Sequence, residues 1–185
     1  MIARFETYVL LCAILTWVLV EDVRTRKIRN WVTLVLIVTG VAASVTAYGG
    51  ITIRESLVGL LVGFAPAFLM FAIGGMGGGD VKLMAGIGAW IGPWPVLTVF
   101  VVAAIVGSVL GLAMSLWQGR LILVLRNTLG LGMSLLNAPR LGLEHVREVG
   151  QACGGTKKGL PYAVPIWIGT VLTLFTPVGS LLTGS

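Results

Sequence analysis

Residues 74–83 read GGMGGGDVKL, in which five glycines and a methionine lead to Asp80 and directly into an apolar segment. Aspartate is a good helix N-cap, so Asp80 taken alone allows a purely structural reading. An ionisable group next to apolar, membrane-type segments is costly, however, and usually faces a cavity or a partner. Glycines beside it allow another chain to approach the backbone closely. The stretch therefore indicates a functional site at the start of a helix.

The composition around this stretch is that of a membrane protein. Hydrophobic residues make up 57% of the 185 residues and charged residues 11%, which is typical of membrane-spanning helix bundles. The length suits a single membrane-embedded domain covering 1–185. Cys12 and Cys153 lack the spacing of a zinc site, and we expect neither a metal nor a cofactor.

Six apolar segments predict an all-α, polytopic membrane helix bundle with about six transmembrane helices. They cover residues 7–20, 31–48, 55–73, 80–91, 96–117 and 160–182. The fourth is too short to cross a bilayer core, which takes about 20 residues, so it either recruits glycine-cluster residues or lies inside the bundle. Glycine pairs at 59/63 and 107/111 predict close helix packing.

The segment 118–159 is predicted to be a cytoplasmic loop with an interfacial helix over 121–136. A transmembrane helix at 121–136 would place Arg126 inside lipid and reverse the direction of the last span. The alternative is that this segment crosses the membrane buried within the protein.

The positions of the basic residues predict the orientation. Connections 21–30, 74–82 and 118–159 hold eleven of the thirteen Lys and Arg residues, and the opposite side has only Arg4 and Arg54. By the positive-inside rule these three connections are cytoplasmic and both termini lie outside. The net charge of +6 is thus explained by topology and contact with anionic lipid, and no nucleic-acid partner is expected.

Two of the seven acids, Asp22 and Asp80, then fall at the cytoplasmic ends of separate spans. A helix end neutralised by Arg24 or Arg26 would explain Asp22 alone. Together, the two carboxyls can share one proton, so that one activates water while the other hydrogen-bonds a peptide carbonyl. Such a pair titrates as a unit. The pair Asp22 and Asp80 therefore fits an aspartic peptidase, and from physics alone it fits a transporter of protons or cations equally well.

Neighbouring residues have predicted supporting roles. Gly77 and Gly79 are expected to adopt conformations closed to other residues and to admit an extended peptide. Lys82 is expected to pair with Asp80, contact the peptide, or extend to lipid phosphate. Glu21 is expected at the surface. Because Asp80 begins a helix and Asp22 ends one, the helix dipoles predict Asp80 as the anionic base.

Three motifs, in order, resemble those of the type IV prepilin peptidases. Residues 77–83, GGGDVKL, resemble the GxGD motif of that family. Residues 22–30, DVRTRKIRN, resemble its basic loop after the first aspartate, with Arg29 where the family commonly has proline. Residues 160–165, LPYAVP, are similar to the opening of its last span.

The resemblance implies a membrane aspartic protease of the bacterial inner membrane that cuts prepilins at the cytoplasmic face. Cleavage would follow a glycine that ends a basic leader, and the substrate would continue as a hydrophobic helix. The paired CxxC motifs of the bifunctional members are missing, so the chain resembles the short form associated with tight-adherence or Flp pili, and N-methyltransferase activity is not expected.

Two other classes of protein fit the same acids. A proton- or cation-coupled transporter would also place acids beside glycine-broken helices, although no internal repeat is evident. A pilus-assembly scaffold would use them only for packing. The cognate prepilin and the oligomeric state are not encoded in any pattern we identify.

Overall fold

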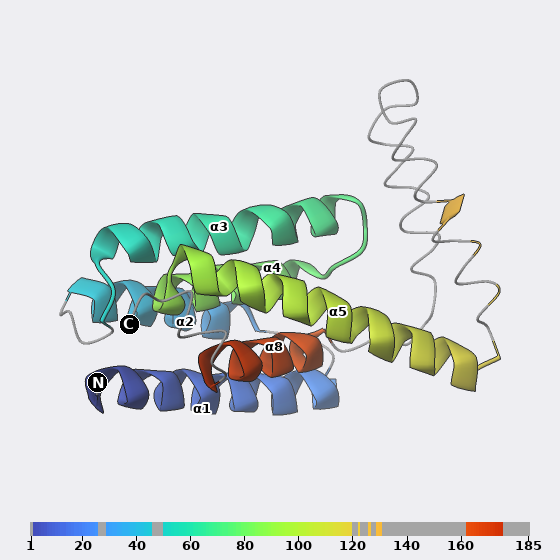
Figure 1. The fold of residues 1–185 in the computed structure, drawn as a ribbon, viewed down its shortest axis with the longest axis horizontal. Coiled ribbons are helices and arrows are strands. Elements are labelled where there is room, and N and C mark those ends of the chain that lie inside the picture. The colour runs from blue at the N-terminus through green and yellow to red at the C-terminus, as the bar shows by residue number, and fades with distance from the viewer. Residues whose placement is uncertain are drawn as a thin grey trace, which may run out of the picture.

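The described part of the chain is helical. The computed structural model describes residues 2–25, 29–45, 50–119, 122, 126, 129–130 and 162–175. Within them lie α1 (Ile2–Thr25), α2 (Asn30–Val45), α3 (Ile53–Ala72), α4 (Gly78–Ile91), α5 (Pro93–Trp117) and α8 (Ala163–Phe175), as Figure 1 shows. The all-α prediction is confirmed over these residues. The predicted interfacial helix at 121–136 lies, apart from four positions, outside them.

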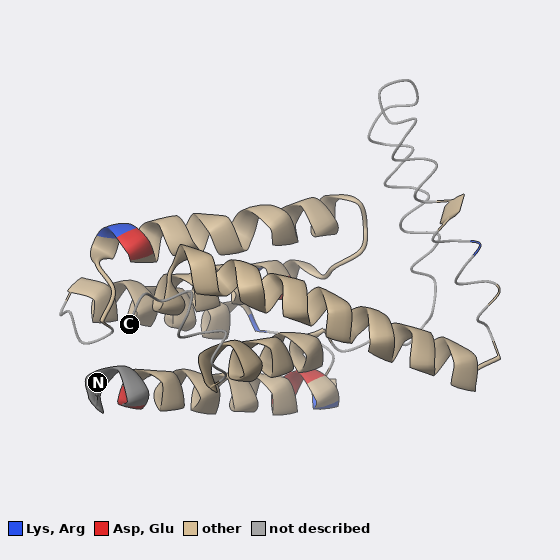
Figure 2. Cartoon of the chain, in the orientation of Figure 1, with Lys and Arg blue, Asp and Glu red and all other residues tan. Residues whose placement is uncertain are grey.

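The helices alternate in direction along one bundle. The carboxyl-terminal ends of three helices, α1, α3 and α5, lie at one side of the bundle (Figure 1). The amino-terminal ends of α2, α4 and α8 lie at the same side. Charged residues of the described helices gather near the helix ends and leave the middle of the bundle uncharged (Figure 2). The predicted placement of Asp22 and Asp80 at one end is therefore confirmed, and we call this end the acid end.

α4 is the central helix of the bundle. Every residue from Asp80 to Ile91 except Lys82 is buried, against α2, α3 and α5. Trp90 Nε1 donates to the Leu36 carbonyl at 2.9 Å, and Ser56 Oγ donates to the Ala89 carbonyl at 2.7 Å. The short fourth segment thus lies inside the bundle, which is one of the two alternatives that its length allowed.

Glycines allow α3 to approach α4 closely. A Cβ at Gly59 would overlap the Gly88 carbonyl oxygen, and one at Gly63 would overlap that of Met84. The packing role predicted for the 59/63 pair is confirmed. The 107/111 pair behaves differently, since Gly107 faces Pro165 of α8 whereas a Cβ at Gly111 would meet nothing within 4 Å.

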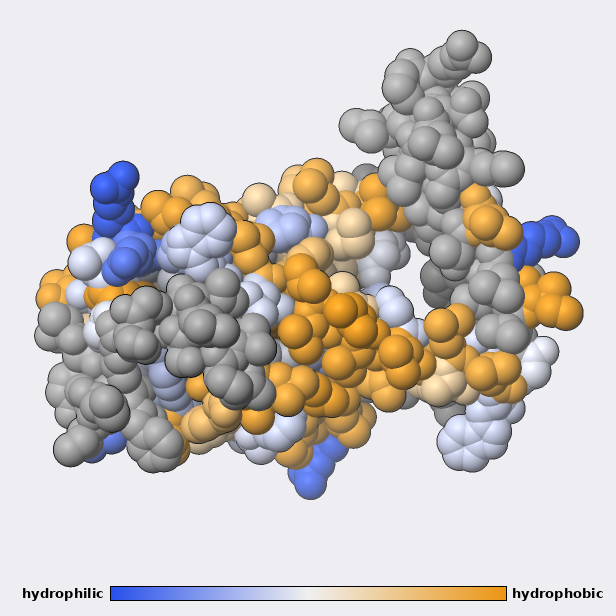
Figure 3. Space-filling view, in the orientation of Figure 1, coloured by the Kyte–Doolittle hydropathy of each residue, from blue (hydrophilic) through white to orange (hydrophobic). Residues whose placement is uncertain are grey.

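The outer surface of the bundle is apolar. Leu61 and Leu69 of α3 and Ile105 and Val109 of α5 are each about three-fifths exposed, and Figure 3 shows a broad hydrophobic surface on one face. Such exposed apolar area is typical of a surface that contacts lipid or a partner. Among the described helices, α3 and α5 are long and apolar enough to cross a membrane, by length and composition, and α2 and α8 are shorter apolar helices. The count of about six transmembrane helices and the location of the termini stay predictions.

Two glycines shape the connections on either side of α4. Gly74 has φ of 81° in the turn after α3, and Gly92 has φ of 83° between α4 and α5. These backbone angles are disfavoured for other residues. Pro93 then begins α5, a position where proline is tolerated because its missing N–H has no partner within the helix.

Candidate active site

The two predicted acids are both buried at the acid end. Asp22 lies in the last turns of α1 and is 7% exposed, and Asp80 lies in the first turn of α4 and is 9% exposed. They are near enough for the charge of Asp22 to act on Asp80. Buried carboxyls that interact in this way are uncommon outside functional sites. The fold therefore brings together two acids that are far apart in the sequence.

The environment of Asp80 favours its protonated form. Burial, and after it the charge on Asp22, raises the pKa of Asp80 to about 7, against the lowering effect of a hydrogen bond with the Gly77 backbone. α4 has 14 residues and lies inside the bundle, with Asp80 in its first turn. The raised pKa runs against the helix-dipole hypothesis, which expected the anion at Asp80, and which of the two acids holds the proton stays a prediction.

Gly77 serves Asp80 in a way that the sequence did not indicate. It is the N-cap of α4, with φ of −79° and ψ of 149°, an extended conformation that any residue adopts. A Cβ at this position would lie 2.9 Å from Oδ2 of Asp80. The expectation of an unusual backbone conformation at Gly77 is therefore wrong, and the absent side chain makes room for the carboxylate. Gly79 is half-buried in the first turn of α4.

Two polar contacts connect the helix ends around the acids. Glu21 Oε1 pairs with Arg29 Nε at 2.9 Å, and the Glu21 side chain is only 15% exposed. Because its side chain is so little exposed, the prediction of a surface Glu21 is wrong. Its partner Arg29 lies across the connection between α1 and α2. Lys82 Nζ donates to Asn30 Oδ1 at 2.8 Å, so α4 is linked to the start of α2. These contacts hold α1, α2 and α4 together where the acids lie.

Tyr162, just before α8, also belongs to this region. Burial, together with the charge of Asp80, raises the pKa of its phenol. Tyr162 was not among the predicted site residues, although it is the tyrosine of the LPYAVP segment, and that match was the signal that could have found it.

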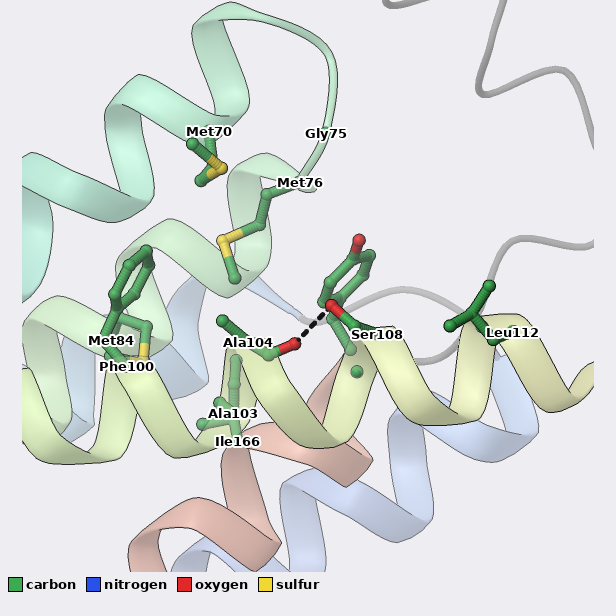
Figure 4. A pocket seen from close by; sticks show the side chains of 13 residues that line it. Met70, Gly75, Met76, Met84, Phe100, Ala103, Ala104, Ser108, Leu112 and Ile166 are labelled. Carbon is green, nitrogen blue, oxygen red and sulfur yellow. Dashed lines mark hydrogen bonds between the residues drawn. The ribbon is translucent and has the colours of Figure 1, made fainter. Parts of the chain in front are cut away.

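A cavity of about 580 Å³ adjoins the acid end. Its lining comes from the end of α3, the loop before α4, Met84 of α4, one side of α5 and the beginning of α8, and Figure 4 shows these side chains. Met76 of the loop and Tyr162 are both part of the lining. The cavity therefore reaches the surroundings of Asp80.

Comparison with known proteins identifies the family of the chain. The model of the type IV leader peptidase family matches residues 9–112, a range that contains both acids. The prepilin leader peptidase/N-methyltransferase of Burkholderia pseudomallei is 32% identical over 119 residues, which cover 60% of this chain and 38% of the relative. That of Neisseria gonorrhoeae is 28% identical over 106 residues, 54% of this chain and 37% of the relative.

An archaeal relative is also similar. The preflagellin peptidase of Methanococcus maripaludis is 33% identical over 78 residues, 39% of this chain and 33% of the relative. The matched region thus spans less than two-fifths of each of these curated relatives. No solved structure shows significant similarity to the chain. The family match extends over more than half of the sequence, and the chain belongs to the type IV leader peptidase family.

Proposed function

We propose that the chain is a prepilin leader peptidase, an aspartic endopeptidase in which Asp22 and Asp80 form the catalytic pair. The observation that carries this proposal is the pair itself: two buried carboxyls that interact at one end of an apolar helix bundle. Family membership supplies the reaction class, because its named relatives are leader peptidases and a preflagellin peptidase.

The proposed reaction divides one proton between the two acids. Burial and the charge of Asp22 raise the pKa of Asp80, so we assign the proton to Asp80 and the role of base to Asp22. Asp22 removes a proton from water as the water oxygen attacks the scissile carbonyl carbon, and Asp80 hydrogen-bonds the carbonyl oxygen. Collapse of the tetrahedral intermediate breaks the C–N bond, and the nitrogen leaves with a proton from the acid pair. No metal or cofactor takes part in this scheme.

The setting of the reaction is inferred from the apolar exterior and the position of the acids. The exposed apolar side chains of α3 and α5 support insertion in the bacterial inner membrane. The concentration of Lys and Arg in the connections at the acid end favours the cytoplasmic face for the active site. The substrate is then a prepilin with a basic leader and a hydrophobic helix, cut after the leader glycine.

The proposed activity is peptidase alone. The sequence contains two cysteines, Cys12 and Cys153, too few for the paired CxxC motifs that resemblance associates with bifunctional members. For residues 1–185 we therefore propose peptidase activity alone, with a prepilin of tight-adherence or Flp pili as the substrate. The mass of the mature pilin's amino terminus after cleavage by the purified protein, with S-adenosylmethionine added, tests this: a gain of one methyl group would contradict it.

The peptidase proposal is tested by coexpression with a prepilin and by following its leader. Asp22→Asn and Asp80→Asn should each abolish processing while the protein stays folded and membrane-inserted. Glu6→Gln is the matched control, because it removes an exposed acid from the same helix as Asp22 and should process normally. Continued processing by folded Asp80→Asn would reject the pair, and Asp80-dependent proton flux in empty liposomes would instead support a transporter.

A further inference from the structure

The cavity beside the acid end has no part in the two-acid chemistry. Its volume of about 580 Å³ lies within the range of ligand sites in proteins. The question is therefore what chemical class of ligand it takes.

The lining selects an apolar ligand. Its large side chains include three methionines and Phe100, and none of the described residues that line it is charged. The hydroxyl of Ser108, which also lines it, already donates to the Ala104 carbonyl at 2.7 Å (Figure 4). Methionine side chains are flexible and adapt to apolar groups of different shape. The described lining therefore suits an apolar group and offers no counter-charge to a basic leader.

Two residues of the cavity lining are neighbours of the Asp80 site. Met76 immediately precedes Gly77, the residue over which the Asp80 carboxylate lies. Tyr162 lines the cavity and lies in the field of Asp80. A group that fills the cavity therefore lies on the side of the bundle where Asp80 is.

We propose that this cavity is a substrate subsite that binds large apolar side chains of the prepilin's hydrophobic segment next to the scissile bond. The proposal rests on the proposed peptidase function and adds a site for the part of the substrate that the acids do not bind. Occupation by the substrate is favoured over occupation by a lipid chain because the lining includes Tyr162, which lies in the field of Asp80, and Met76, which precedes Gly77. The subsite contributes to substrate binding by holding the apolar segment, and the acids carry out the cleavage.

Gly111 is a position from which the cavity can be filled. It lines the cavity, and a Cβ built on Gly111 meets nothing within 4 Å. Gly111→Phe should raise KM for prepilin about tenfold or more, with little change in kcat. The reason is that loss of a pocket for one apolar side chain typically weakens substrate binding by about this factor. Val109→Phe is the matched control, because it adds the same ring to α5 at a position that is 60% exposed and outside the lining. Ala104→Phe fills the cavity from a second position. It provides the same test if Gly111→Phe fails to fold.

A second substrate shows whether the effect comes from the cavity. A prepilin whose large apolar residues near the cleavage site are changed to alanine should have a raised KM with the wild-type enzyme. Filling the cavity should then raise KM no further. If Gly111→Phe, Ala104→Phe and Val109→Phe all behave like wild type with the natural prepilin, the subsite is rejected while the peptidase function stands.

Two further outcomes separate the proposals. If the effect of filling depends on the acyl length of the lipid vesicles and is the same for both prepilins, the cavity holds lipid and the proposal is wrong. If the wild-type protein cleaves no prepilin, the peptidase function fails instead. Binding is measured independently of cleavage by a benzophenone side chain introduced at Ser108 in the Asp80→Asn protein, which should crosslink to the apolar segment and not to the leader. Crosslinking to the leader alone would overturn the assignment.

Discussion

The carboxylate of Asp80 lies where a side chain of residue 77 would be: a Cβ on Gly77 would come 2.9 Å from Asp80 Oδ2. This distance is shorter than an ordinary contact, so any larger residue must displace the carboxylate. The first glycine of the GxGD motif thus acts through the space it leaves and not through its backbone angles.

Gly77→Ala should therefore impair catalysis without unfolding the protein. We expect a fall of about 10²-fold in kcat, since a displacement of about 1 Å at a reacting group costs that much. The measurement is the cleavage rate of purified, folded variant. Gly78→Ala is the control, because its Cβ would meet only the Phe71 ring at 3.6 Å, an ordinary contact. Equal losses in the two variants would show that the position of the carboxylate is not what Gly77 protects.

Removal of the Asp22 charge should lower the pKa of Asp80. Asp22→Asn eliminates one of the two causes that raise this pKa to about 7, and burial stays as the other. Cleavage should fall about 10²–10⁴-fold, the range for loss of a general base. Carboxyl infrared difference spectra across pH, with Asp80→Asn used to assign the band, monitor the titration. An Asp80 midpoint that is unchanged in Asp22→Asn, or that shifts equally in Glu6→Gln, would show that the two acids do not interact.

The stability of the protein should decrease as pH rises from about 4 to about 7. The pKa of Asp80 is 3.8 ordinarily and about 7 in the folded state, so the folded state binds more protons than the unfolded state in this window. The free energy of unfolding therefore falls with pH there and levels off above pH 7. Unfolding in detergent at a series of pH values should show this slope in wild type and a shallower one in Asp80→Asn. A wild-type curve that rises between pH 4 and 7 and is unchanged in Asp80→Asn would contradict the raised pKa.

The sequence predicted the helices and the acid pair because both depend on local pattern. Apolar runs define the spans, and the charges at 21–30 and 74–82 place Asp22 and Asp80 at the same end. The protonation of Asp80 and the environment of Glu21 could not be predicted because they depend on burial in the folded bundle. The protonation of Asp80 depends on the surrounding bundle, and Glu21 is partly buried because Arg29 pairs with it across the connection.

The neighbours of the site were harder to predict than the acids. Tyr162 comes to Asp80 from a distant part of the sequence, and only the packing of α8 brings it there. The two glycine pairs have the same spacing and differ in role, since Gly59 and Gly63 face a helix backbone whereas Gly111 faces a cavity. Spacing indicates that helices can approach closely, but the position of the neighbouring helix determines whether they do.

Gly59→Ala should destabilise the bundle strongly. Its Cβ would overlap the Gly88 carbonyl oxygen, and a backbone atom cannot rotate away as a flexible side chain can. The cost of such overpacking is about 1–3 kcal/mol, and we expect the upper end or more because α3 and α4 must separate. Thermal unfolding in detergent measures it. Gly111→Ala is the control, since its Cβ enters open space, and a loss of stability equal to that of Gly59→Ala would contradict the close approach of α3 and α4.

The hydrogen bond from Lys82 to Asn30 gives a direct test of what Lys82 does. If its role is to connect α4 to α2, Lys82→Ala and Asn30→Ala should each cost about 1 kcal/mol or less, as expected for an exposed hydrogen bond, and the double variant should cost no more than either alone. If Lys82 instead binds the prepilin, Lys82→Ala alone should raise KM, and Asn30→Ala should leave KM unchanged. Unfolding and cleavage measured on wild type and these three variants separate the two roles. Because Lys82 lies two residues after Asp80, a purely structural result would mean that the motif GGGDVKL combines one catalytic acid with its anchor to the neighbouring helix.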